Sequence, residues 1–221
     1  MKVIAAIPVR NQLKWTAPLV ESLLIGDQID ELWVYDNGST DFTSHWLKHR
    51  AQLDSRLIYI NASDMRLYDM WNDMILTASA VGGVRLAILN NDIRLPFGAI
   101  RKMAELMDGY QIAMIEKDRS SFAGIDPNSY AKETHWNHRV GYAFMVEADF
   151  WQGQPYAVHP DYIIWWGDDD LFRRCETGGG KICRIVGVGC DHSEWSSDPE
   201  YRGDKWRDVE IDRETYRQMW G

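Results

Sequence analysis

The segment LAILNNDIRL, from Leu86 to Leu95, is the stretch that decides the fold of this 221-residue chain. Its apolar beginning extends a short run from Val84 that has the length and composition of a buried strand. The polar residues NND follow at positions 90–92, and Pro96 then introduces a segment with helical spacing. An apolar strand that leads through a polar loop into a helix is the basic unit of parallel α/β sheets. Because such sheets bind ligands at the carboxyl ends of their strands, the segment predicts both a fold and the edge where function resides.

Apolar runs and helical patterns alternate on both sides of that segment. The clearest helix runs from Leu67 to Ala78, where apolar side chains recur at the i, i+3, i+4 and i+7 spacing. We expect strands at Val3–Pro8, Glu31–Tyr35, Leu57–Ile60, Val84–Leu89, Gln111–Ile115, Arg139–Val146 and Lys181–Val188, and further helices at Asp168–Glu176 and Val209–Trp220. The polar segment Glu116–His138 predicts a long loop. Together these patterns predict an open, mainly parallel α/β sheet with flanking helices.

Charge and composition exclude several classes of protein. Lys and Arg number 24 against 33 Asp and Glu, and the formal net charge of −9 argues against a protein that binds nucleic-acid backbone. Hydrophobic residues make up 45% of the chain, which is too many for a disordered protein. The longest apolar stretches fall short of the ~20 residues that cross a bilayer, and the N-terminus lacks the pattern of a signal peptide. Three cysteines without a CxxC spacing suit a reducing compartment. We therefore expect no membrane span and a cytoplasmic location.

Two predicted strands end in acidic residues. The sequence VYDNGSTD, from Val34 to Asp41, places Asp36 at a strand end, although the same residue types also form tight turns and helix caps. Asn90, Asn91 and Asp92 form an oxygen-rich cluster of the kind that holds Mg²⁺ or Mn²⁺. We expect Asp36 and Asp92 to lie on neighbouring strand ends, and we pair Asp92 with His192, beyond the last strand, around one cation.

The C-terminal part concentrates aspartates and tryptophans. Asp168, Asp169 and Asp170 precede a helical pattern, but adjacent helix positions point ~100° apart, so the three carboxylates cannot all cap one helix. At least one of them is available for another task. Seven of the 11 tryptophans lie in the last 86 residues, either as core residues or as flat faces for a ligand.

The motifs in this order resemble one family. DNGSTD, LNNDI, GYAFMV (Gly141–Val146), GDDDLFRR and a late His are similar to the nucleotide-diphospho-sugar glycosyltransferases of the GT-A fold, family 2 type, over Lys2–His192. The resemblance implies a GT-A type Rossmann-like sheet with a C-terminal acceptor-side extension, in one domain. Residues 1–116 would bind the nucleotide sugar, and residues 117–221 would complete the acceptor and catalytic side. It also implies a metal-dependent, inverting enzyme of the hexosyltransferase type that moves a sugar from a UDP-sugar to a hydroxyl acceptor.

The resemblance also assigns roles to individual residues. At the donor, Pro8, Val9 and Arg10 would contact the nucleoside, and Asp36 would bind the base. Asn90 and Asn91 would lie beside the ribose and diphosphate. Arg66 or Arg10 would balance the charge of the diphosphate, and Asn72 would lie in the same region. Asp92 and His192 would bind Mn²⁺ or Mg²⁺. GDDDLFRR is similar to a segment of β-1,4-galactosyltransferases, which places Asp168 at the catalytic base and Asp169 beside it on the acceptor side. The neighbouring Trp165 and Trp166 either stack on a sugar ring of the acceptor or pack in the core under the loop. Gly167 replaces the Glu that normally precedes Asp168.

Two other functions fit parts of the sequence. A sugar-phosphate nucleotidyltransferase also uses a parallel sheet and metal-binding acids, but it would carry a Gly-rich, Lys-containing phosphate loop after the first strand. A catalytically silent carbohydrate-binding protein would use the tryptophans, but it would need no acids at strand ends. The acceptor stays open between a glycan, a protein and a modified nucleobase, with duplex nucleic acid least favoured by the charge.

Overall fold

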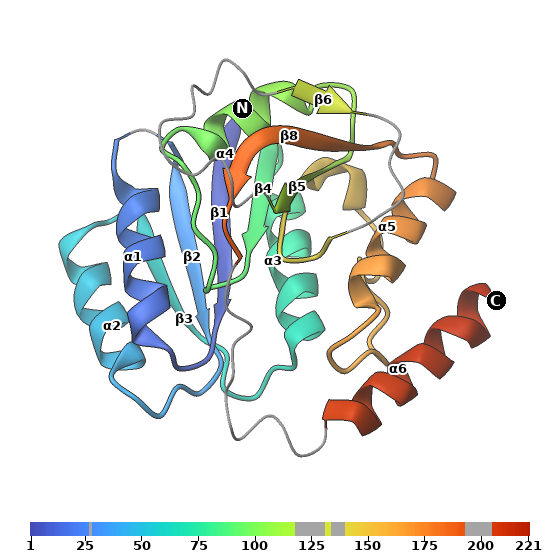
Figure 1. Ribbon diagram of the computed structural model, residues 1–221, viewed down its shortest axis with the longest axis horizontal. Helices are drawn as coiled ribbons and strands as arrows, with labels where there is room; N and C mark the ends of the chain where they lie inside the picture. Colours follow the sequence, from blue (N-terminus) through green and yellow to red (C-terminus); the bar gives the residue numbers. More distant parts are fainter. Residues whose placement is uncertain (27, 118–130, 134–139, 193–204) are drawn as a thin grey trace.

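A computed structural model describes residues 1–26, 28–117, 131–133, 140–192 and 205–221 of the chain. One eight-stranded sheet crosses the molecule in the order β3-β2-β1-β4-β7-β5-β8-β6 (Figure 1). Its strands are β1 (Lys2–Val9), β2 (Glu31–Asp36), β3 (Leu57–Asn61), β4 (Val84–Leu89), β5 (Ile112–Lys117), β6 (Ala131–Glu133), β7 (Ala143–Glu147) and β8 (Ile182–Cys190). The helices are α1 (Leu13–Leu24), α2 (Thr43–Leu53), α3 (Leu67–Val81), α4 (Ala99–Leu106), α5 (Gly167–Thr177), α6 (Lys205–Trp220) and the short 3₁₀ helix η3 (Ala148–Trp151).

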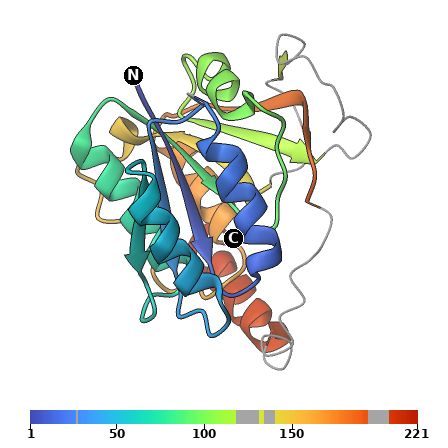
Figure 2. The same cartoon turned by 90° about the vertical axis from the view of Figure 1, so that its left-hand side faces the viewer.

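The four strands β1 to β4 form the parallel part of the sheet. Side chains alternate across a strand, so a strand that is apolar at every position needs cover on both faces. In β1, Val3, Ala5 and Ile7 pack into the core under α1 and α4, whereas Ile4 and Ala6 pack into the core under α3. Figure 2 shows helices on both sides of the strands. The predicted α/β class is therefore confirmed.

Beyond β4 the sheet becomes mixed. β7 is antiparallel to both β4 and β5, β8 is parallel to β5, and β6 is antiparallel to β8. The loop predicted at Glu116–His138 is wrong where β6 adds an edge strand, and most of that segment lies outside the described residues. The expected neighbourhood of Asp36 and Asp92 is also wrong, because β1 separates β2 from β4 in the sheet.

The C-terminal elements complete one face of the sheet. α5 and α6 lie side by side in both views, at the edge away from β3 (Figures 1 and 2). α6 begins at Lys205, four residues before the predicted helix start at Val209. In the part of the chain that the structure describes, no helix is long and apolar enough to cross a membrane.

Candidate functional site

The loops that follow β1 and β2 hold each other in place. Asn11 adopts a left-handed conformation with φ of 58°, and its Oδ1 accepts the backbone N–H groups of Thr40 (2.7 Å) and Asp41 (3.2 Å). In return, the Asn11 N–H donates to Ser39 Oγ at 2.7 Å, and the Gln12 N–H donates to Asp41 Oδ2 at 2.9 Å. The carboxyl ends of these two strands therefore present a cross-linked polar surface.

Asp36 is the buried anchor of this surface. Its residue is only 1% exposed, and its carboxylate accepts the Ser39 N–H (3.0 Å), the Tyr59 hydroxyl (2.8 Å) and the Ser44 hydroxyl. Burial by itself would raise the pKa of this carboxyl, but the hydrogen bonds from Ser39, Ser44 and Tyr59 outweigh it and lower the pKa. Burial and the Asp36 carboxylate in turn raise the pKa of Tyr59 to about 12. These contacts show that Asp36 fixes the loop that follows β2.

The residues predicted at the nucleoside end β1. Pro8 is half-buried, Val9 is buried, and Arg10 is exposed just beyond the strand. The Val9 carbonyl accepts the Asn37 N–H at 2.7 Å, which ties β1 to the loop after Asp36. Arg10 is therefore exposed at the carboxyl end of β1, beside this surface.

Arg66 and Asn72 make internal contacts. Arg66 donates to Asp69 from Nε at 2.9 Å and caps the start of α3; this hydrogen bond is the main reason why its pKa is raised. Asn72 Oδ1 accepts the N–H groups of Ala157 and Val158, both at 2.8 Å, and its Nδ2 donates to the Val158 carbonyl at 2.8 Å. Asn72 thus ties a loop to α3, and its role at the donor stays a prediction.

The structure brings Asp92 and His192 together. β8 curves across the molecule toward the end of β4 (Figure 1), with a register shift against β5 and a Gly187 φ of 79°. As a result, Asp92 Oδ1 lies 3.3 Å from His192 Nε2, and Asn90 Nδ2 lies 3.4 Å from the same nitrogen. The Tyr142 ring stacks on the imidazole with centroids 4.5 Å apart. Sequence analysis did not single out Tyr142, because its aromatic ring carries no catalytic signature.

Backbone contacts fix both members of this pair. Arg94 and Asp191 form an isolated antiparallel bridge, with N–H to carbonyl distances of 2.8 and 3.0 Å. Asn91 turns away from His192 and donates from Nδ2 to the buried Thr16 hydroxyl at 3.0 Å. Asn91 thus holds the loop against α1, while Asn90 and Asp92 face His192.

The chemistry of this pair fits a divalent cation. Adjacent ligands of an octahedral Mg²⁺ or Mn²⁺ lie about 3 Å apart, which is close to the 3.3 Å between Asp92 Oδ1 and His192 Nε2. One carboxylate and one imidazole also suit Mn²⁺, which accepts oxygen and nitrogen ligands. Among the described residues, no group of three His, Cys, Asp or Glu side chains gathers to hold a metal. A cation held by this pair would therefore complete its shell with water and with oxygens of a bound substrate.

Asp168 lies against the segment Gly141–Tyr142, just before β7. An ideal Cβ on Gly141 would be 2.6 Å from Asp168 Oδ2 and 2.7 Å from Asp168 Cβ, so only glycine fits there without displacing the carboxylate. The next residue, Tyr142, stacks on His192, and its carbonyl accepts the Asn90 N–H at 2.8 Å. The dipeptide Gly141–Tyr142 therefore joins the half-buried Asp168 to the Asp92–His192 pair.

The three consecutive aspartates have different surroundings. Asp170 is fully buried and accepts hydrogen bonds from the His159 N–H (2.8 Å), Arg174 Nε (2.7 Å) and Trp220 Nε1 (2.7 Å). Asp168 and Asp169 are half-buried at the first turn of α5. Asp170 is thus structural, and the other two residues stay partly exposed.

The Tyr68 ring explains why residue 167 is a glycine. A Cβ at Gly167 would come within 2.3 Å of the buried Tyr68 ring, whose hydroxyl donates to the Ile164 carbonyl at 2.9 Å. Burial, followed by the charge of Asp168, raises the pKa of Tyr68 well above its usual value. The departure from the expected Glu at 167 is therefore matched by an aromatic ring that fills the space.

The two predicted acceptor tryptophans precede this turn. Trp165 and Trp166 are half-buried; Trp166 has a left-handed φ of 64°, and its indole lies 5.2 Å from the Tyr216 ring. The segment also rests on α6 through Asp212, which sequence analysis missed because an Asp in a charged helix resembles a solvated residue. Trp136 and Trp195 lie outside the described residues.

Comparison with known proteins gives the family and the fold. The sequence model of the family described as "Glycosyl transferase family 2" matches residues 4–121, more than half of the chain. No curated protein sequence matches this chain.

Several solved structures are similar in fold. "TarS 1-349" of S. aureus in complex with UDP has a TM-score of 0.62 and 15% identity, over 96% of this chain and 64% of that one. The mannosyltransferase PcManGT of Pyrobaculum calidifontis, in complex with GDP-Man and Mn²⁺, has a TM-score of 0.63 and 12% identity, over 98% of this chain and 64% of that one. This chain therefore spans about two-thirds or less of the length of the structures it resembles.

Proposed function

This chain belongs to glycosyl transferase family 2 and has the GT-A fold, and we propose that it is a metal-dependent, inverting enzyme. It would transfer a sugar from a nucleotide-diphosphate donor, with UDP-sugars as the first choice, to a hydroxyl of an acceptor. One observation carries the proposal: Gly141–Tyr142 touches Asp168 on one side and His192 of the Asp92–His192 pair on the other. A proton acceptor and a cation-binding pair therefore border one place.

The donor would lie across the ends of β1, β2 and β4. Arg10 stands exposed at the end of β1, and Asp36 fixes the loop beside it. The solved neighbours were obtained with UDP, with UDP-GlcNAc and with GDP-Man, so they support a nucleotide-sugar donor and leave the base open. We choose UDP because Asp36 matches the position of the family's acid that hydrogen-bonds the base, which is usually uracil.

The transfer step assigns one proton and one bond to named residues. Asp168 accepts the proton of the acceptor hydroxyl while that oxygen attacks the anomeric carbon from the face opposite the leaving group. The bond from this carbon to the diphosphate oxygen breaks, and the nucleoside diphosphate leaves with the electron pair. A cation held by Asp92 and His192 would stabilise the charge on this leaving group. Asn90 would lie at the donor, beside His192, and Trp165, Trp166 and Asp169 would border the acceptor side.

The acidic chain is compatible with this chemistry. A net charge of −9 leaves few basic groups for a diphosphate, so we assign its neutralisation to the cation and to Arg10. Cys175, Cys183 and Cys190 are buried thiols, and burial raises the pKa of Cys183 to about 11. Thiols of this kind suit the cytoplasmic location that we propose.

A panel of sugar nucleotides tests the proposal. The protein is incubated with UDP-, GDP- and other nucleotide sugars, with Mn²⁺, Mg²⁺ or EDTA, and release of nucleoside diphosphate is measured without acceptor. We expect release with UDP-sugars and a divalent cation, and no release with EDTA. Absence of release, and of thermal stabilisation by any nucleotide diphosphate with metal, would count against the enzyme class. Release from a GDP-sugar alone would correct the donor and keep the class.

Asp168→Asn then tests the base. The variant should keep donor binding and lose ~10²-fold or more in turnover. Glu105→Gln on α4, which removes an exposed carboxylate paired with Lys102 at 3.1 Å, serves as the matched control and should keep full turnover. Near-normal turnover of Asp168→Asn would remove Asp168 from the mechanism.

A further inference from the structure

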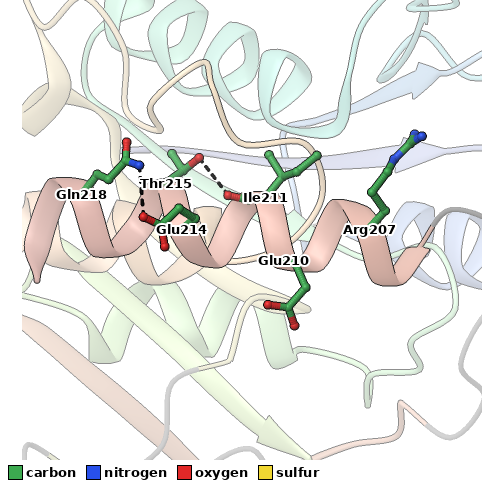
Figure 3. Close-up of a pocket in the computed structure, with 6 residues that line it drawn as sticks. All are labelled: Arg207, Glu210, Ile211, Glu214, Thr215 and Gln218. Carbon is green, nitrogen blue, oxygen red and sulfur yellow. Dashed lines mark hydrogen bonds between the residues drawn. The ribbon is translucent and has the colours of Figure 1, made fainter.

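α6 packs against the segment that carries the proposed base. Its inner face carries Asp212, Tyr216, Met219 and Trp220, at the spacing of one helix stripe. Asp212 and Trp220 make hydrogen bonds to the segment around α5, and the Tyr216 ring lies 5.2 Å from that of Trp166. The outer face lines a groove with residues of α6 alone, and Figure 3 shows them projecting from one side of the helix: Arg207, Glu210, Ile211, Glu214, Thr215 and Gln218.

Asp212 is fully buried, and both oxygens of its carboxylate accept hydrogen bonds from backbone N–H groups. Oδ1 accepts the N–H of Ile163 at 2.8 Å, and Oδ2 accepts those of Ile164 (2.8 Å) and Trp165 (2.7 Å). An ionised carboxylate only accepts hydrogen bonds, so it matches three converging N–H groups. Buried polar groups that lose such a partner cost free energy, so this contact is specific for an acid.

A second contact lies on the other side of Asp168. Trp220 Nε1 donates to Oδ1 of the buried Asp170 at 2.7 Å. Both contacts come from α6, one to residues 163–165 and one to Asp170. The two contacts lie on either side of Trp166 in the sequence. Its backbone φ of 64° is one that residues other than glycine seldom adopt. Such a conformation persists only where the surrounding contacts hold it.

We propose that Asp212 is a positioning residue for Asp168, and that α6 acts as a clamp on the chain on both sides of Asp168, through the backbone of residues 163–165 and through the side chain of Asp170. The inference rests on the proposed function of Asp168 as the base. The clamp would fix the turn from residue 163 to Asp170, and Gly141 leaves no room for the carboxylate to shift toward it. Misplacement of a catalytic group by about 1 Å can cost 10²-fold in rate, so a contact at this distance from the chemistry can control turnover.

Asp212→Asn tests the clamp directly. The amide keeps the shape of the side chain but places an NH₂ against at least one of the three N–H groups. We expect kcat to fall about 10- to 100-fold, while donor affinity stays within about twofold of the original. Hydrogen exchange of residues 163–170 should rise, whereas that of residues 90–92 should not. Glu210→Gln on the outer face of α6 is the matched control and should leave both measurements unchanged (Figure 3).

Two further variants keep the test decisive. Trp220→Phe keeps an aromatic ring but removes the N–H that donates to Asp170. It should lower kcat in the same way but by less than Asp212→Asn. This variant serves as the test if Asp212→Asn does not fold. In an Asp168→Asn background, Asp212→Asn should lower turnover no further, because it acts through Asp168. A lower melting temperature with unchanged kcat in both Asp212→Asn and Trp220→Phe would overturn the proposal. So would an equal loss with and without Asp168.

The outcomes also separate the clamp from the proposed function. If the unaltered protein cleaves no nucleotide sugar, the proposed function fails and the positioning role falls with it, whatever hydrogen exchange shows. If the protein is active and Asp212→Asn matches Glu210→Gln in kcat and in exchange, the proposed function stands and the clamp is overturned.

Discussion

Gly141 lies so close to Asp168 that a Cβ on the glycine would be 2.6 Å from the carboxylate Oδ2. The contact joins two segments that meet only in the folded chain, the residues just before β7 and the first turn of α5. It fixes one wall of the space in which Asp168 can sit. A side chain at position 141 would therefore shift the carboxylate of the proposed base without removing its charge.

Gly141→Ala should therefore displace Asp168. We expect a loss of about 1–3 kcal/mol in the free energy of unfolding from overpacking, and a fall in turnover of at least ~10-fold from the displaced carboxylate. Steady-state kinetics and chemical denaturation measure the two effects. In an Asp168→Asn background, Gly141→Ala should lower turnover no further. A full additional loss there would show that Gly141 acts by another route.

Asp92→Ala and His192→Ala should each weaken the metal dependence of donor binding. The pair is the place where a carboxylate and an imidazole converge, at 3.3 Å, and removal of either leaves a cation with one protein ligand fewer. With the original protein, UDP at ~100 times its dissociation constant should add about 2.7 kcal/mol of stability in the presence of Mn²⁺, or roughly 5–11 °C in melting temperature.

The thermal shift of each variant, with Mn²⁺ and with EDTA, is the measurement. Both variants should show a similar small shift under the two conditions, whereas Glu105→Gln should keep the difference. A metal-dependent shift that survives in Asp92→Ala would place the cation elsewhere.

The free energy of unfolding should fall in acid as Asp36 becomes protonated. Its pKa is lowered in the folded state, where the hydrogen bonds outweigh burial, so the ionised form contributes stability above the unfolded pKa of about 3.9. This contribution is lost as the pH falls below ~4 toward the folded pKa. Asp36→Asn should cost about 1–3 kcal/mol near neutral pH and should flatten the pH dependence of stability in that acidic window. Denaturation curves between pH 3 and 7 measure both, and a parallel pH profile in the variant would contradict the assignment.

Gly167 and Tyr68 should be coupled in stability. A Cβ at 167 would meet the Tyr68 ring at 2.3 Å, and the ring is buried on every side. Gly167→Ala alone should cost about 3 kcal/mol or more, among the largest effects of single substitutions. In a Tyr68→Ala background the same change should cost less, because the cavity accepts the methyl group. Additive losses in a double-mutant cycle would show that the ring moves freely out of the way.

The sequence by itself determined the α/β class and the place of the site along each strand. Apolar runs such as 84–89 and the helical spacing at 67–78 are local patterns, and the strands and helices formed where these patterns predict them. Polar residues at the end of an apolar strand must lie at the edge of a parallel sheet, so Asp92 could be placed there from its position alone. The family resemblance carried by the motifs is confirmed by the family match over residues 4–121.

Only the tertiary structure decided which of those polar side chains face one another. The curvature of β8 brings His192 to Asp92, and the insertion of β1 between β2 and β4 keeps Asp36 apart from them. Asp36 and Asn72 look like ligand-binding residues in the sequence, yet folding gives them internal partners. The hydrogen bonds from α6 to residues 163–165 and to Asp170 likewise form only in the folded chain. These contacts join residues far apart in the chain, and their geometry depends on strand order, strand curvature and helix docking, which no local pattern of side chains encodes.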